Sequence, residues 1–259
     1  MDRGFLFGDG VYEVIPVYNG KIFHINEHLK RLQNSLDSIQ INNPYSDSKW
    51  LDIFQQLLGF SSGSNQSLYL QISRGADTKR KHSFESLTPT VFVESNPLTP
   101  KSKSELENGF NAITQADFRW QRCDIKSTSL LANIIYSQQA MQNQAEEVIL
   151  HRDQVITEGA TSNVFIVKNN TLFTHPTGPN ILSGITRDLV LESALRCNIN
   201  IKEASFSADE LMNADEVWIS SSTREVMPIT QIDSQLINNG KIGKHWSQVY
   251  DHYQELKYA

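Results

Sequence analysis

The sequence predicts an α+β protein with two domains. Apolar residues change between strand spacing and helical spacing several times along the chain. A stretch rich in Ser, Lys and Pro at residues 97–107 is typical of a linker. A chain of 259 residues, 39% of them hydrophobic, can form one large core or two modest ones. We therefore expect a small α+β domain at residues 1–101 and a larger domain at residues 102–259.

The first half is expected to contain both strands and a helix. Residues Gly10–Tyr18 predict a strand, and Asn19-Gly20 is typical of the tight turn of a hairpin. Asn26 is a suitable N-cap for the apolar residues at helical spacing that follow it, so a helix is expected from about Glu27 to about Ile39. Further strands are expected at residues 68–73, 90–94 and 110–114.

The second half predicts short strands and one helix. From Glu146 onward the strands are separated by turns at Arg152-Asp153 and Asn169-Asn170. A helix then opens at Thr186 and continues through apolar residues at helical spacing to about Leu195. Many short strands with few helices are compatible with a barrel-like second domain.

Charge and composition exclude several kinds of partner. The formal charge of −6 provides no basic excess to neutralise the phosphates of a nucleic acid. No stretch is apolar enough to span a bilayer, and the N-terminus lacks the pattern of a signal peptide, so a cytoplasmic protein is expected. Cys123 and Cys197 lie far apart without metal-ligand spacing, which favours reduced, buried thiols and no metal site.

A lysine and a carboxylate suggest pyridoxal phosphate chemistry. Lys126 lies in the segment 122–127, and Glu158 follows it just before the apolar run Val164–Val167. A lysine amine can hold the aldehyde of this cofactor as a Schiff base. A carboxylate against the ring nitrogen keeps that nitrogen protonated and makes the ring an electron sink.

Two segments could bind the cofactor phosphate. Gly184, Ile185 and Thr186 stand at the start of the expected helix, where unpaired backbone amides attract a dianion. The hydroxyl-rich turn of residues 220–223 follows the apolar strand of residues 217–219 and offers further donors.

Four strings of the sequence, in the right order, resemble the fold-type IV (class IV) pyridoxal phosphate aminotransferases. They are FGDGVYEVIPVYNGKIFHINEHLKRL from residue 7, RCDIKSTSLLAN from residue 122, EGATSNVFIV from residue 158 and SGITRDLVLE from residue 183. Within that family the strings are most similar to the D-amino-acid aminotransferases. The resemblance implies a small α/β domain, a larger pseudobarrel domain and pyridoxal 5'-phosphate as cofactor.

The resemblance also assigns cofactor contacts. It implies that Arg31 supplies the charged contact to the phosphate, while Ile185, Thr186 and Ser222 add backbone and hydroxyl bonds. Ser222 stands where the family more often has threonine, and Arg224 stands where a small polar residue is usual. We expect Arg224 to be an extra cation near the phosphate or the rim of the active site, where it would alter substrate choice.

The loop of residues 74–82 resembles the carboxylate-binding loop of D-amino-acid aminotransferases. It carries Arg80 and His82, and the resemblance adds Tyr12 as a third substrate-binding residue. A guanidinium donates two parallel bonds to a carboxylate and does not lose its charge. In the related enzymes this loop reaches across a subunit boundary, which implies a homodimer.

The implied reaction is transamination, with Lys126 as the base that moves the Cα proton of the substrate. The expected net reaction converts D-alanine and 2-oxoglutarate to pyruvate and D-glutamate. A branched-chain L-amino-acid aminotransferase and a 4-amino-4-deoxychorismate lyase share the scaffold and remain alternatives.

A third alternative is a catalytically silent cofactor-binding protein. Residues 1–4 stand directly before the Phe7–Gly10 motif, where members of the family usually have a strand or hairpin. A short N-terminus could leave a sheet edge exposed or weaken the small domain.

Overall fold

The computed structural model describes residues 1–60 and 63–258. The chain separates into two compact units. The small unit comprises Met1–Thr99 and Ile125–Leu130, and the large unit comprises Pro100–Asp124 and Leu131–Ala259. Both units contain helices and strands, which confirms the predicted α+β class. The division into folding domains at residues 1–101 and 102–259 stays a prediction.

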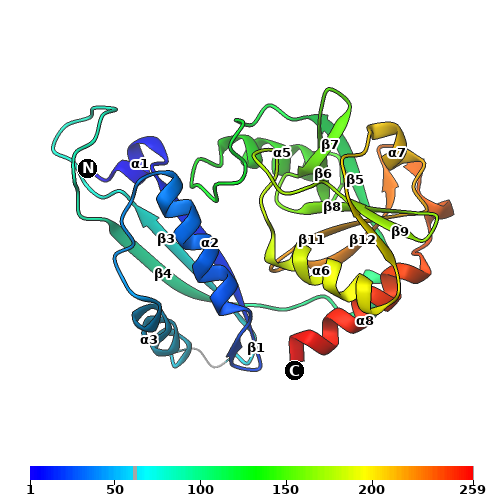
Figure 1. Cartoon of the computed structure of the whole chain (residues 1–259), viewed down its shortest axis with the longest axis horizontal. Coiled ribbons are helices and arrows are strands. Elements are labelled where there is room, and N and C mark those ends of the chain that lie inside the picture. Colours follow the sequence, from blue (N-terminus) through cyan, green and yellow to red (C-terminus); the bar gives the residue numbers. More distant parts are fainter. Residues whose placement is uncertain (61–62, 259) are drawn as a thin grey trace. The chain divides into compact units, whose positions relative to one another are not determined.

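The small unit is built on an antiparallel sheet with the strand order β2-β1-β3-β4 (Figure 1). Its strands are β1 (Gly10–Tyr18), β2 (Lys21–Ile22), β3 (Gln66–Ser73) and β4 (Thr90–Pro97). Its helices are α1 (Arg3–Phe7), α2 (Ile25–Ser38) and α3 (Asp47–Leu58). The predicted turn at Asn19-Gly20 is confirmed, and both residues have positive φ angles, as a tight hairpin turn requires.

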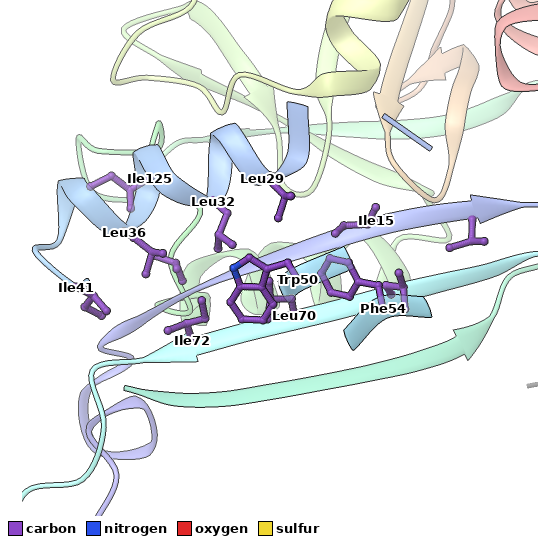
Figure 2. Packing of buried hydrophobic residues seen from close by; sticks show 13 residues of the cluster. Ile15, Leu29, Leu32, Leu36, Ile41, Trp50, Phe54, Leu70, Ile72 and Ile125 are labelled. Atoms are coloured by element: carbon purple, nitrogen blue, oxygen red, sulfur yellow. The ribbon is translucent and has the colours of Figure 1, made fainter. Parts of the chain in front are cut away.

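One face of this sheet forms the core of the small unit. The side chains of a strand alternate between two faces, and Val11, Ile15 and Val17 of β1 are fully buried on one of them. Leucines of α2 at helical spacing point onto this face, together with aromatic side chains of α3 (Figure 2). The labelled members of this cluster are Ile15, Leu29, Leu32, Leu36, Ile41, Trp50, Phe54, Leu70, Ile72 and Ile125.

Segment 125–130 belongs to the small unit because it pairs with β1. The Tyr12 amide donates to the Lys126 carbonyl at 3.0 Å, and the Thr128 amide donates to the Gly10 carbonyl at 2.9 Å. Val11 and Ser127 form an antiparallel bridge between these bonds. The start of β1 is therefore paired along the edge that faces away from β3.

The large unit is built on a curled mixed sheet with the order β10-β9-β8-β11-β12-β5-β6-β7, and β13 pairs with β12. This sheet confirms the expected pseudobarrel architecture. Helices α6 and α8 lie together (Figure 1), and α5 packs its Tyr136 and Ala140 on Val148 and Leu150 of β6.

The strands of the large unit are β5 (Phe110–Ala116), β6 (Glu147–Arg152), β7 (Val155–Gly159), β8 (Asn163–Lys168), β9 (Thr171–Thr174), β10 (Asn200–Glu203), β11 (Glu216–Ser221), β12 (Glu225–Ile232) and β13 (Gln235–Leu236). Its helices are α4 (Lys103–Leu106), α5 (Leu131–Gln142), α6 (Ile185–Arg196), α7 (Ala208–Met212) and α8 (Lys244–Tyr258), with a short 3-10 helix, η1, at Asn238–Gly240.

Several expected helix and turn boundaries were wrong by one or two residues. Helix α2 begins at Ile25 and its N-cap is His24, so Asn26 lies inside the first turn and is not the cap. The turn expected at Arg152-Asp153 lies at Asp153-Gln154, because Arg152 ends β6 and the next two residues have positive φ angles. Helix α6 begins at Ile185, one residue before the expected start.

The expected linker is partly ordered structure, since β4 extends to Pro97 and α4 begins after a Ser102 cap with a complete capping box. Cys123 and Cys197 are both free thiols, although Cys197 is only partly buried. In the described part of the chain, no helix has the length and apolar character needed to cross a bilayer.

Candidate active site

Lys126 is held in place from both sides of its backbone. Its amide donates to the Ser35 hydroxyl at 3.3 Å and its carbonyl accepts from Tyr12. The neighbours Ile125 and Ser127 are buried, whereas Lys126 is partly exposed. The Lys126 ammonium lies 4.3 Å from the centre of the Tyr12 ring, a cation–π distance. The small unit therefore brings together two of the predicted site residues.

Arg31 is oriented by a buried carboxylate that the sequence analysis did not identify. Glu13 of β1 is 1% exposed and accepts bonds of 2.8 Å from both Nε and Nη2 of Arg31. His28, one turn before Arg31 on α2, places its Nδ1 2.8 Å from Glu13 Oε2. A charged residue at a core-facing position of an otherwise apolar strand was the signal for this group.

Electrostatics favour an ionised Glu13. Burial by itself raises the pKa of this carboxyl, but the charge and hydrogen bonds of Arg31 and His28 outweigh burial and hold the pKa well below its usual range. Burial lowers the pKa of His28, and the nearby charges of Arg31 and Lys126 act in the same direction against the raising effect of Glu13. A neutral His28 donates from Nδ1 to the carboxylate.

Arg80 and His82 lie on the loop between β3 and β4 and contact α1. The Arg80 guanidinium lies 4.9 Å from the centre of the Phe7 ring, and the His82 ring centre lies 5.5 Å from it. Both residues are exposed. The Tyr12 ring instead contacts Tyr69 and Lys126. The three predicted carboxylate-binding residues therefore form two separate groups within the small unit.

Glu158 in the large unit is a buried carboxylate with three donors. Its Oε1 accepts from Arg119 at 2.6 Å, and its Oε2 accepts from the Leu182 amide at 3.0 Å and the Asn163 amide group at 3.3 Å. A carboxylate has about four lone-pair positions. Counting the donors of residues 1–60 and 63–258, Glu158 can accept one further bond.

Glu158 ends a chain of alternating charges. Arg152 and Asp117 are 3.1 Å apart, Asp117 pairs with Arg119 at 2.9 Å, and Arg119 pairs with Glu158. Burial raises the pKa of Glu158 to about 7, assisted by the charge of Asp117 and opposed by Arg119 and the Leu182 amide. A cation placed beyond Glu158 would continue the alternation and favour the ionised carboxylate.

Asn163 connects Glu158 to the start of α6. Its side-chain amide donates to Glu158 and to the Leu182 carbonyl, the latter at 2.8 Å. A Cβ atom at Gly184 would lie 2.1 Å from the Asn163 Oδ1, so any side chain at this N-cap position would displace the Asn163 amide. Gly184 has no side chain with which to cap the first-turn amides of Ile185 and Thr186. These amides are suited to an anion.

Ser220 lies near the end of β11, the strand next to β8, and Ser222 is in the turn that follows. Ser220 pairs with Asn163 across the two strands, so both side chains lie on one face of the sheet. The Ser220 hydroxyl is buried and has no hydrogen-bond partner among the described residues. A buried donor without a partner is expensive in free energy, which fits the oxygens of a bound phosphate group. The residues of the large unit therefore fit pyridoxal phosphate.

Arg224 pairs with a buried carboxylate of the large unit. Its Nη2 donates at 2.6 Å to both Glu147 and the Thr161 hydroxyl, and its Nη1 donates to the Glu146 carbonyl at 3.2 Å. Glu147 is buried, so Arg224 neutralises it and links β6 to the turn after β11. The expectation that Arg224 lies near the phosphate or the active-site rim stays a prediction, and the structure adds that its charge is paired with Glu147 inside the large unit.

The chain is similar to known proteins over most of its length. Residues 10–232 match the family model described as amino-transferase class IV. The chain is 44% identical over 243 residues to the D-alanine aminotransferase of Bacillus licheniformis, covering 93% of this chain and 85% of that protein. It is 41% identical to the D-alanine aminotransferase of Listeria monocytogenes, covering 98% and 89%.

A solved structure extends the comparison to the fold. The branched-chain amino acid aminotransferase of Escherichia coli has a TM-score of 0.91 and 23% identity, covering 99% of this chain and 88% of that one. At this identity the likeness concerns the fold alone.

Proposed function

Because the chain belongs to the class IV aminotransferases, we propose that it transfers the amino group of D-amino acids with pyridoxal phosphate as cofactor. The substrates are D-alanine and 2-oxoglutarate, and the products are pyruvate and D-glutamate. The similarity to D-alanine aminotransferases over nearly the whole chain carries this proposal. The proposed small and larger domains are residues 1–101 and 102–259.

Six residues are proposed to hold the cofactor. Lys126 binds its aldehyde carbon, Glu158 binds its ring nitrogen, and Arg31 supplies a charge to its phosphate. Ile185, Thr186 and Ser222 add backbone and hydroxyl donors to the phosphate. When bound, pyridoxal phosphate supplies a conjugated cation that accepts the electron pair released at the substrate Cα.

Lys126 is proposed to move the substrate proton. Its amine takes the proton from Cα and returns one during the reverse half-reaction. The Tyr12 ring beneath the ammonium and the two backbone bonds of Lys126 limit the positions that this amine can adopt. Restricting a catalytic base in this way lowers the entropy that must be lost before proton transfer.

Glu158 is proposed to keep a proton on the cofactor nitrogen. Arg119 and the two amide donors fix the direction of its carboxylate, and one acceptor position is left for the N–H group. The alternating charges from Arg152 to Glu158 make a further cation favourable at that position.

Arg80, His82 and Tyr12 are proposed to bind the substrate carboxylate. Arg80 provides the bidentate charge-assisted bonds, and the imidazole and the phenol orient the remaining lone pairs. The separation of the Arg80–His82 pair from Tyr12 within one small unit supports a role for the loop in the site of a second subunit.

A homodimer is therefore proposed. The proposed location of the protein is the cytoplasm, as the sequence predicts. Helix α5 offers an apolar surface for association, since Leu131, Ile134 and Ile135 at helical spacing are 72%, 62% and 41% exposed. Adjacent large apolar side chains in contact with water are typical of an interaction surface.

The test is an assay with separate amino donors. D-Alanine, L-alanine, L-leucine and 4-amino-4-deoxychorismate are each supplied with 2-oxoglutarate, and pyruvate and the two glutamate enantiomers are measured by chiral chromatography. D-Glutamate formed from D-alanine supports the proposal. L-Glutamate from L-leucine would instead support the branched-chain alternative. Pyruvate released from aminodeoxychorismate without an oxo acid would identify a lyase, and no product from any donor would identify a silent protein.

A further inference from the structure

Helix α1 contacts the substrate loop through two residues on one side of the helix. Phe7 places its ring 4.9 Å from the Arg80 guanidinium and 5.5 Å from the His82 ring. Arg3, four residues earlier, donates from Nη1 to the Lys81 carbonyl at 2.8 Å and from Nη2 to the His82 carbonyl at 3.0 Å. Positions i and i+4 lie on the same side of a helix, so α1 holds both the backbone and the side chains of residues 80–82. Figure 1 shows α1 beside this loop.

Asp9 holds the side chain of Arg3, the residue of α1 that donates to the loop. It accepts from Arg3 Nε at 2.8 Å and from Nε and Nη2 of Arg74 at 2.9 Å. The Arg3 side chain is 3% exposed and that of Arg74 is 7% exposed. Although burial alone would raise the pKa of Asp9, the bonds and charges of Arg74 and Arg3 lower it. One partly buried carboxylate therefore holds two guanidinium groups.

The same cluster holds the far side of the loop. The Arg74 guanidinium lies 3.6 Å from the centre of the Phe84 ring, and Arg74 also donates to the carbonyls of Ile39 and Gln40. Residues 80–84 are therefore attached at two places, by Arg3 and Phe7 at residues 80–82 and by Arg74 at Phe84. Loops attached at several points lose less conformational entropy when a ligand binds.

We propose that α1 and the turn after it are the positioning element for the substrate carboxylate, with the Phe7 ring as the platform that aligns Arg80 and His82. This inference rests on the proposed role of Arg80 and His82. Phe7 acts through those two side chains and does not itself bind the carboxylate. The ring fixes the direction of a guanidinium that would otherwise sample many rotamers in water.

The first experiment compares Phe7→Ala and Phe7→Leu with the matched control Phe5→Ala. Phe5 lies on the same helix and is 87% exposed. In the two Phe7 variants, we expect the KM for D-alanine to rise roughly three- to tenfold, the scale of losing exposed aromatic and cation–π contacts. The kcat should stay within about twofold, because the base and the cofactor residues are unchanged. Phe5→Ala should keep both constants of the parent enzyme.

The second experiment measures the loop directly. Lys79, Arg80 and Lys81 are consecutive trypsin cleavage sites. Cleavage of the native enzyme within residues 79–81 should be several times faster in Phe7→Ala and in Phe7→Leu than in the parent and in Phe5→Ala, because a released loop fits a protease more readily. The cleavage positions are identified by mass spectrometry of the fragments.

The outcomes separate this inference from the proposed function. An unchanged KM in Arg80→Ala would overturn the carboxylate role of the loop and this inference with it. A raised KM in Arg80→Ala together with parental KM and cleavage rates in both Phe7 variants would overturn the positioning role alone. If Phe7→Ala fails to fold, Phe7→Leu decides, since it keeps apolar volume without the ring. Adding Phe7→Ala to the Arg80→Ala, His82→Ala double variant should produce no further rise in KM.

Discussion

Arg119 donates a 2.6 Å hydrogen bond to Glu158, and their side chains are 7% and 6% exposed. Arg119 also pairs twice with Asp117, so the guanidinium is fixed before any ligand binds. This relationship places a positive charge behind the carboxylate and leaves its remaining acceptor position for a cation on the opposite side.

Lys126→Ala should abolish covalent attachment of the cofactor. Borohydride treatment of the parent enzyme with pyridoxal phosphate should fix the cofactor on the peptide that contains Lys126, as detected by mass spectrometry. The variant should show no label there and no transamination, because no other group is proposed to bind the aldehyde. Lys101→Ala changes an exposed lysine and is the control. A reducible linkage that persists in Lys126→Ala would contradict the assignment.

Glu158→Gln should lower kcat roughly ten- to hundredfold, the range that corresponds to losing a hydrogen bond between charged groups. The cofactor should still bind, since Arg31 and the α6 amides are intact. Stopped-flow measurement of the half-reaction with D-alanine tests the rate, and titration of the apo-protein tests the affinity. Glu107→Gln, at an exposed position, is the control. Near-normal turnover of Glu158→Gln would exclude the proposed role of the carboxylate.

The stability of the cofactor-free protein should depend on Glu158 between about pH 4.5 and pH 7. Burial raises the pKa of this carboxyl from 4.5 to about 7 in the folded state. The folded state therefore binds the proton more tightly, so this contribution to stability is fully present below about pH 4.5 and is lost as the pH rises through about 7. The loss is on the order of 3 kcal/mol at most.

Urea denaturation at several pH values checks this expectation. Glu158→Gln resembles the protonated form, so the free energy of unfolding of the parent should fall relative to the variant as the pH rises from 5 to 8. Saturating pyridoxal phosphate should reduce the difference, because a cation beside Glu158 stabilises its ionised form. A constant difference between the two proteins across this range would show that Glu158 does not titrate there.

Arg31→Ala should weaken cofactor binding more than it lowers the rate at saturating cofactor. The variant also removes the guanidinium that pairs with the buried Glu13, which keeps its bond to His28. Breaking a buried ion pair destabilises a protein by about 3 to 5 kcal/mol. Lys30→Ala, on the exposed side of the same helix, should change neither property. Fluorescence titration of the apo-protein and thermal denaturation measure the two effects, and equal cofactor affinity in both variants would contradict the role of Arg31.

Mixing Lys126→Ala with Arg80→Ala should restore part of the activity at a low concentration of D-alanine, where Arg80→Ala turns over little, if the loop serves a second subunit. Lys126→Ala and Arg80→Ala are unfolded together, refolded and assayed with D-alanine. Heterodimers then contain one intact site and one doubly damaged site, so up to about a quarter of the parental activity is expected from random pairing. Parent activity refolded in the same way is the control. Absence of rescue would indicate that the loop acts within its own subunit.

The sequence alone predicted strands β1, β3 and β4 of the small unit and proposed the residues of the candidate site. Strand β1 and its Asn19-Gly20 turn follow from alternation and from residues that tolerate positive φ angles, which are local properties. Helices α3, α5 and α8 were not predicted, and α5 shows why. Its apolar residues lie on both the buried and the exposed side of the helix, so no single apolar stripe marks it in the sequence.

The partners of the site residues could only be found in the tertiary structure. Glu13 and Arg31 are 18 residues apart, and Arg119 and Glu158 are 39 residues apart. No periodicity links residues at such distances, because their contact depends on how strands and helices pack. Arg224 shows the same limit, since its charge was visible in the sequence and its buried partner Glu147 was not.

The sequence by itself determined the chemistry available to this protein: a lysine, a carboxylate, an uncapped helix start and an Arg-x-His loop. The tertiary structure decided which of these groups are oriented, paired or neutralised. The physical reason is that the charge and direction of a side chain depend on burial and on partners from distant segments, as the three donors of Glu158 and the contacts of α1 with residues 80–82 demonstrate.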